Sequence, residues 1–215
     1  MALVQVAVIQ LSSQDDVSAN LARVRALVLE AGRSGAELVA LPENFAFMGE
    51  ESNKRAIAEV IDADPAGPIV DALRLAARDA RVWLVGGGMP ERSDDPDRPY
   101  NTSLLFAPDG RIVSRYRKVH LFDVDLPDGT KLLESGATTA GSEPSVSEIS
   151  GRAGQPFALG MTICYDLRFP ELYRRLGERG ARVVTVPAAF TLTTGKDHWH
   201  VLLRARAIES QSYVL

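Results

Sequence analysis

Short apolar runs alternate with helix-like segments in the first part of the chain. Residues 3–10 (LVQVAVIQ) and 36–42 (AELVALP) are short, apolar and rich in β-branched side chains, which is typical of buried strands. Residues 17–35 between them predict a helix, because apolar side chains recur at helical spacing until two glycines end the pattern. A second helix over 69–80 and a third strand over 81–88 follow. This order predicts an α/β fold in which helices cover a sheet of buried strands.

The pattern changes after residue 99. In residues 100–118 the triplet PDG separates two strand-like runs, which indicates a hairpin. Residues 120–154 are rich in Gly, Ser, Pro and Thr, and they predict loops with short strands. Strands and helices then alternate again, with strands expected over 156–163 and 181–187 and helices over 170–180 and 197–211.

Two segments that lie 145 residues apart (180 − 35 = 145) resemble each other. GAELVALPENF begins at Gly35 and GARVVTVPAAF at Gly180, and each follows a strand and a helix. We therefore predict two related halves, each beginning β-α-β. The second half stops at SYVL, where the strand matching 81–88 would begin. We expect a single domain over 1–215 that lacks its last strands, because an unpaired apolar sheet edge is unusual.

Composition and charge narrow the class of protein. The 215 residues are 46% hydrophobic and 24% charged, as in a globular domain with a sizeable core. The formal net charge is −4 with both signs interspersed, so no basic stripe is available for nucleic acid. The N-terminus resembles neither a signal peptide nor a membrane span. We expect a cytoplasmic protein that binds neither nucleic acid nor a membrane.

The single cysteine, Cys164, is the first candidate for chemistry. Composition alone predicts a buried hydrophobe, which is the usual role of a free cysteine. Its position argues otherwise, because it ends the strand of 156–163 and precedes a helix-like run, and a helix N-terminus stabilises a thiolate. A turn from strand to helix also exposes its side chain. Cys164 is therefore a candidate nucleophile.

A thiol nucleophile needs a base or a cation nearby. One solution is a histidine, and the chain has three (His120, His198, His200). The other is a carboxylate with a lysine, and Glu43 in LPENF and Lys118 in YRKVHLF both follow predicted strands. Ligands collect at the carboxyl ends of strands in helix-covered sheets, so these two residues and Cys164 could meet there.

Three segments together resemble the signature segments of the nitrilase superfamily of carbon-nitrogen hydrolases, namely LPENF, YRKVHLFD and GMTICYDLRFPELYR. Their order and spacing are similar to the family pattern, and the resemblance covers essentially the whole chain. The later segment AFTLTTGKDHWHVLLRARAIESQSYV is similar to the branch that contains omega-amidase and deaminated glutathione amidase. The resemblance implies a four-layer αββα sandwich and a homodimer or larger homo-oligomer. The two related halves agree with that fold.

The same resemblance implies roles for individual residues. Glu43 would be the general base, Lys118 the cation that stabilises the tetrahedral intermediate, and Cys164 the nucleophile. Glu134 in LLESG resembles the family's second glutamate, which orients the lysine, and the backbone N–H of Tyr165 would help to hold the oxyanion. The implied reaction is hydrolysis of a small amide by water through a cysteine thioester, without a cofactor.

The substrate stays open among several classes. A carboxylated amide similar to deaminated glutathione is narrowly favoured over amides of 2-oxo dicarboxylic acids. Carbamoyl amines, nitriles and an inactive binding or oligomerising module are further alternatives. Phe122, Arg168 and Phe190 are candidate substrate-binding residues, and Arg168 has the alternative of an ion pair with Glu171.

Two other features have plainer interpretations. His198 and His200 in DHWH resemble a metal pair but lack cysteine or carboxylate partners at metal-ligand spacing, so we expect no metal and predict Asp197 as a helix N-cap. The three glycines at 86–88 follow a strand as phosphate loops do. They lack the spacing of a nucleotide-binding motif, and we interpret them as a closely packed strand end.

Overall fold

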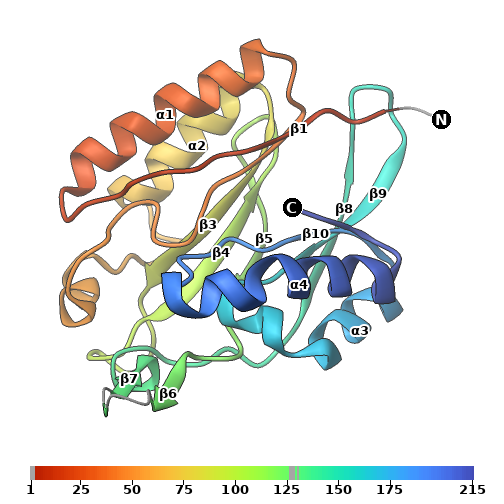
Figure 1. Cartoon of the computed structure of the whole chain (residues 1–215). Coiled ribbons are helices and arrows are strands. Elements are labelled where there is room, and N and C mark those ends of the chain that lie inside the picture. The colour runs from red at the N-terminus through yellow and green to blue at the C-terminus, as the bar shows by residue number, and fades with distance from the viewer. Residues whose placement is uncertain (1–2, 126–128, 130) are drawn as a thin grey trace.

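Two β-sheets packed face to face, each covered by two helices, form the fold of the chain (Figure 1). The computed structural model describes residues 3–125, 129 and 131–215. Among these residues no helix is both long and apolar enough to cross a membrane.

The first sheet has the strand order β1-β2-β3-β4-β5. Its strands are β1 (Val6–Val8), β2 (Leu38–Ala40), β3 (Trp83–Glu91), β4 (Tyr100–Phe106) and β5 (Ile112–Arg117). The first three strands are parallel, because the helices α1 (Val17–Arg33) and α2 (Pro68–Ala80) return the chain to the same end of the sheet. The last two strands are antiparallel and form the predicted hairpin.

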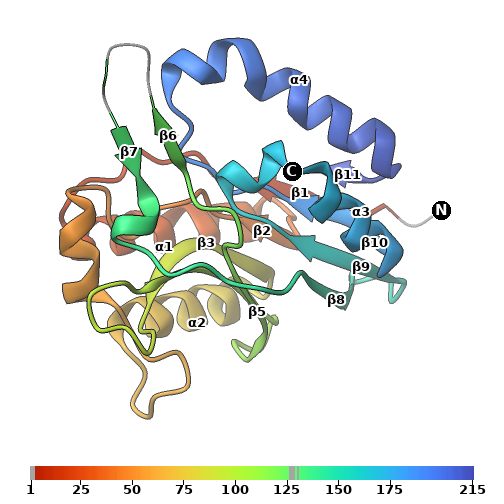
Figure 2. The same cartoon turned by 90° about the horizontal axis from the view of Figure 1, so that it is seen from below.

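The second sheet has the order β11-β10-β9-β8. Its strands are β8 (Ser145–Ser150), β9 (Pro156–Met161), β10 (Ala181–Thr185) and β11 (Tyr213–Val214), and its helices are α3 (Pro170–Glu178) and α4 (Leu192–Ser210). The remaining elements are a two-stranded ribbon and three 3-10 helices: β6 (Asp123–Asp125), β7 (Lys131–Leu133), η1 (Glu51–Ile57), η2 (Glu134–Gly136) and η3 (Cys164–Arg168). Figure 2 shows the ribbon at the same end of the molecule as the start of α4.

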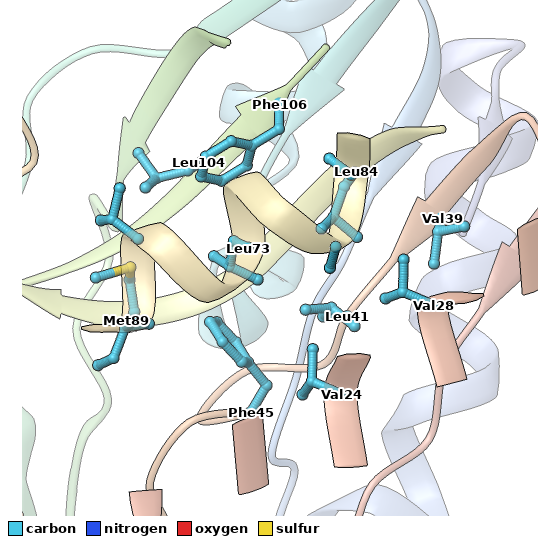
Figure 3. Packing of buried hydrophobic residues seen from close by; sticks show 14 of the residues in the cluster. Val24, Val28, Val39, Leu41, Phe45, Leu73, Leu84, Met89, Leu104 and Phe106 are labelled. Carbon is cyan, nitrogen blue, oxygen red and sulfur yellow. The ribbon is translucent and has the colours of Figure 1, made fainter. Parts of the chain in front are cut away.

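Two apolar clusters hold the layers together. The first lies between α1, α2 and the first sheet, where Val28, Leu73 and Phe106 pack with no exposed surface (Figure 3). The second lies between the two sheets and joins Leu105 of β4 to Leu159 of β9. Burial on both faces explains why these strands are apolar runs rather than alternating ones.

The structure confirms the four-layer αββα sandwich. It also supports the related halves, since Gly35 and Gly180 both have left-handed backbones, with φ of 97° and 89°, before parallel strands. In the second half β11 pairs with β10 in parallel, as β3 pairs with β2 in the first.

Two predictions about elements were wrong. The strand expected over 3–10 is short and lies at the sheet edge, where Val8 is 64% exposed rather than buried. Helix α4 begins at Leu192 with Thr191 as its N-cap, so Asp197 lies inside the helix. The extra first turn includes Gly195, and one glycine costs a helix only about 1 kcal/mol, which tertiary packing can offset.

Candidate active site

Glu43, Lys118 and Cys164 line one cavity of about 550 Å³. Glu43 follows β2, Lys118 directly follows β5, and Cys164 follows β9. The chain thus brings residues from three strand ends, separated by up to 121 positions (164 − 43), to one place between the two sheets.

Glu43 is a buried carboxylate with a full set of donors. Its Oε1 accepts hydrogen bonds from Asn101 Nδ2 at 2.9 Å and Lys118 Nζ at 3.1 Å. Its Oε2 accepts a bond from the backbone N–H of Ala189 at 3.0 Å. Burial alone would raise the pKa of Glu43, but the Lys118 ammonium outweighs it and holds that pKa below its usual value. Glu43 is therefore ionised and fixed in orientation.

Lys118 lies between two carboxylates. Its Nζ donates to Glu43 and also to Glu134, at 3.0 and 2.8 Å from the two Glu134 oxygens. Burial opposes the charge, yet the two carboxylates raise the pKa of Lys118 above its usual value. The side chain is only 2% exposed, so its charge faces the cavity without competition from bulk water.

Cys164 is the first residue of η3 and lies in a strained turn that follows β9. Its φ is +48°, a left-handed value that is uncommon for a side chain other than glycine, and its N–H donates to Pro187 O at 2.8 Å. Burial and the neighbouring Glu43 charge raise the pKa of the Cys164 thiol well above its usual value. The expectation of a helix-stabilised thiolate was wrong, because the following element is a short 3-10 helix and α3 starts only at Pro170. The resting group is a thiol beside an ionised carboxylate.

Close backbone packing positions Glu43. Gly87 lies in β3 with φ of +21°, and a Cβ there would stand 1.9 Å from the carbonyl oxygen of Pro42. A Cβ on the next residue, Gly88, would collide with Asn101 Oδ1 at 2.4 Å. The glycines at 86–88 are therefore closely packed as predicted, although they lie inside β3 rather than at its end.

The family of the chain follows from a comparison with known sequences. A sequence model described as carbon-nitrogen hydrolase matches residues 5–215. The chain belongs to the carbon-nitrogen hydrolase family. This hydrolase is 46% identical over 210 residues to the deaminated glutathione amidase of Synechocystis sp., across 97% of its own length and 75% of that protein. It is 38% identical over 215 residues to omega-amidase NIT3 of Saccharomyces cerevisiae, across 99% and 72% of the two chains.

Solved structures agree with this assignment. The hydrolase superposes on Saccharomyces cerevisiae Nit3, a member of branch 10 of the nitrilase superfamily, with a TM-score of 0.83 at 36% identity, over 98% of this chain and 73% of that one. It also superposes on a glutamate-to-glutamine variant of an amidase from Nesterenkonia sp. AN1 with a TM-score of 0.80 at 28% identity, over 99% and 77% of the chains. In that variant acrylamide has added to the active-site cysteine. The predicted nitrilase-superfamily membership and carbon-nitrogen hydrolase class are confirmed.

The other predicted site residues of this hydrolase separate into two groups. Phe122, Glu134, Tyr165 and Phe190 line the cavity. In the part of the chain that the structure describes, Arg168 does not line the cavity. Its guanidinium lies instead 5.3 Å from the centre of the Phe190 ring and 3.1 Å from His198 Nδ1.

The structure also changes the interpretation of Arg168 and of His120. The proposed ion pair of Arg168 with Glu171 is absent from the salt bridges of the described residues, where Arg168 contacts His198 instead. His120 lies outside the cavity wall, stacked on Phe169 at 3.7 Å with its Nδ1 2.7 Å from Asp166.

Sequence reasoning missed two residues that support the site. Asn101, at the start of β4, donates to Glu43, and no sequence motif singled it out as a site residue. Asp166 has no exposed surface, and it accepts bonds from the N–H groups of Ile163 at 2.8 Å and His120 at 3.1 Å. It also accepts from the Tyr116 hydroxyl at 2.7 Å. The available signal was a carboxylate two residues after the cysteine.

Proposed function

We propose that this hydrolase is an amidase that cleaves a small carboxylated amide through a thioester on Cys164. The observation that carries the proposal is the contact of an ionised Glu43 with Lys118 in the cavity that also contains the Cys164 thiol. The low pKa of Glu43 and the high pKa of Cys164 set the resting protonation states. Glu43 therefore rests ionised and Cys164 protonated, and the proton passes from the thiol to the carboxylate as the sulfur attacks.

Acylation follows from these protonation states. Glu43 takes the proton from the Cys164 sulfur as the sulfur forms a bond to the amide carbon. The oxyanion is held by the Lys118 ammonium and the backbone N–H of Tyr165. Removing one such donor costs about 3 kcal/mol of barrier in comparable sites. When the C–N bond breaks, Glu43 returns its proton to the departing nitrogen, and a thioester remains.

Deacylation uses the same groups. Glu43 takes a proton from water, the resulting hydroxide attacks the thioester carbon, and Lys118 with the Tyr165 N–H again stabilises the oxyanion. The C–S bond breaks and the sulfur regains its proton from Glu43, so the enzyme returns to its starting state. In this scheme Glu134 is a positioning residue, since its two oxygens hold Lys118 Nζ at 3.0 and 2.8 Å.

The substrate we favour is an amide similar to deaminated glutathione. The relatives support this choice, since the deaminated glutathione amidase of Synechocystis sp. is 46% identical and the yeast omega-amidase 38% identical. The second candidate is therefore omega-amidase activity on amides of 2-oxo dicarboxylic acids. Phe122 and Phe190 would contact the acyl chain, because both line the cavity.

A substrate panel tests the proposal. Purified protein is offered deaminated glutathione, 2-oxoglutaramate and an N-carbamoyl amino acid, and the released amine or ammonia is measured. We expect turnover of the first two and an acyl adduct on the Cys164 peptide by mass spectrometry. The matched control is Cys164→Ser, which keeps the shape of the side chain and should abolish turnover. Turnover retained in that variant would refute the thioester mechanism, and no turnover by the wild type would favour an inactive module.

We further propose that residues 1–215 form one domain that assembles in the cytoplasm as a homodimer or larger homo-oligomer. The two apolar clusters support the single domain, because each draws on residues from distant parts of the chain. Size-exclusion chromatography with light scattering tests the assembly, and a monomer at micromolar concentration would refute it.

A further inference from the structure

The cavity has a second, largely buried cation that the proposed reaction does not use. The chain has four lysines, and three of them, Lys54, Lys118 and Lys131, line the cavity. None of the arginines lines it, among the residues that the structure describes. The Lys118 ammonium is already engaged by two carboxylates. Lys54 belongs to η1, and its side chain is only 11% exposed.

The charges around the reacting groups make such a cation necessary for an anionic substrate. Glu43 and Glu134 together carry two negative charges against the one positive charge of Lys118, which leaves a net charge of −1. Glu43 and Lys118 are buried and Glu134 is partly buried, so the field of this cluster inside the cavity is weakly screened. A substrate carboxylate is therefore repelled from the cluster and needs a positive partner elsewhere on the cavity wall.

Lys54 is better placed for that role than Lys131. Lys131 is 67% exposed and lies 3.5 Å from Asp125, so water screens its charge. Lys54 is largely shielded from water, and its charge acts within the cavity, where it helps to lower the pKa of Glu43.

The present partner of Lys54 can be exchanged. Lys54 Nζ lies 2.9 Å from Glu51 Oε1, three residues earlier in the same 3-10 helix, and the Glu51 side chain is 51% exposed. An ion pair with a half-exposed carboxylate contributes little to stability. A substrate carboxylate held in the cavity would meet the same ammonium with less water around it, where a charge-assisted hydrogen bond is stronger.

We propose that Lys54 binds the carboxylate of the substrate, at the end remote from the scissile amide, and that Glu51 competes with that carboxylate for the ammonium. The inference rests on the proposed amidase function and specifies the substrate class of the same site. Lys54 is then a specificity residue that distinguishes carboxylated amides from neutral ones.

Kinetics on a matched pair of substrates test the inference. The pair is 2-oxoglutaramate and its methyl ester, which differ in the one negative charge. For Lys54→Met we expect the ratio of kcat/KM for the acid to kcat/KM for the ester to fall about tenfold or more, because KM rises for the acid and not for the ester. Lys54→Arg should retain the preference for the acid, and Glu51→Gln should lower KM for the acid alone. The control for the change in net charge is Lys196→Met, because Lys196 is an exposed residue of α4 that does not line the cavity.

The ratio of acid to ester is the decisive quantity. Loss of the Lys54 charge also acts on Glu43, and that effect is common to both substrates, so it cancels in the ratio. Equal changes for acid and ester in Lys54→Met, or a raised KM for the acid in Glu51→Gln, would overturn the inference while leaving the amidase function intact.

A binding measurement separates the inference from the proposed function. Calorimetric titration of 2-oxoglutarate into Cys164→Ala needs no turnover, and adding Lys54→Met to that variant should weaken binding about tenfold or more. Unchanged affinity overturns the role of Lys54. An absence of wild-type turnover on every amide refutes the proposed function instead, and the titration still decides whether Lys54 binds the carboxylate.

Discussion

Asp166 provides the sharpest test of how the nucleophile turn is held. The perturbation is Asp166→Ala, which removes a fully buried carboxylate and leaves its donors without an acceptor. Two of these donors are themselves buried, the Ile163 N–H at 2.8 Å and the Tyr116 hydroxyl at 2.7 Å. The other two belong to His120, whose side chain is 26% exposed and can bond to water instead.

The magnitude follows from the two buried donors. Each buried donor left without an acceptor costs about 1–3 kcal/mol, so Asp166→Ala should lower the free energy of unfolding by about 2–6 kcal/mol. This is a large share of the roughly 5–15 kcal/mol that a natural domain has. The control is Tyr116→Phe, which removes one of the same bonds and leaves only the N–H of the half-buried Val119, 3.3 Å from the Tyr116 oxygen, without its acceptor, so it should cost only about 1–2 kcal/mol.

Urea unfolding followed by circular dichroism measures both variants. The midpoint should fall much further for Asp166→Ala than for Tyr116→Phe, at similar slopes. Because Asp166 accepts the N–H of Ile163, the residue before Cys164, we expect kcat of any folded Asp166→Ala protein to fall as well. A loss of stability no greater than that of the control would refute the reasoning.

Three further predictions concern the site and its supports. Glu43→Gln removes a negative charge that raises the pKa of Cys164, and Lys118→Met removes a positive charge that lowers it. The pH midpoint of Cys164 alkylation by iodoacetamide should therefore fall in Glu43→Gln and rise in Lys118→Met. Shifts of equal sign would contradict this. Gly87→Ala should lower the free energy of unfolding by about 2 kcal/mol or more, because the new Cβ would collide with the Pro42 carbonyl and the φ of residue 87 is positive. An unchanged midpoint of urea unfolding would contradict this. Burial and then Asp166 raise the pKa of Tyr116 well above its usual value, so its stabilising contribution is complete below about pH 10 and is lost as pH rises through the folded pKa. Thermal unfolding should show this alkaline loss, smaller in Tyr116→Phe.

Much of the fold could be predicted from local patterns. The helix expected over 17–35 is α1, the one expected over 69–80 is α2, and the PDG triplet does separate β4 from β5. These elements follow from side-chain periodicity and turn residues, which act over a few positions. The boundaries of β1 and α4 differed, because pairing and packing with distant residues decide where such elements begin and end.

The sequence by itself determined the family, the two related halves and the three segments that carry Glu43, Lys118 and Cys164. Their motifs are contiguous, so each is visible without knowing what lies beside it. Only the tertiary structure decided the protonation of the cysteine, since the high pKa of Cys164 comes from burial and from a glutamate 121 positions away (164 − 43). It also decided which unremarkable residues support the site, among them Asn101 and Asp166. Electrostatics and hydrogen bonds depend on distances in space, and in this chain those distances are set by two sheets that pack face to face.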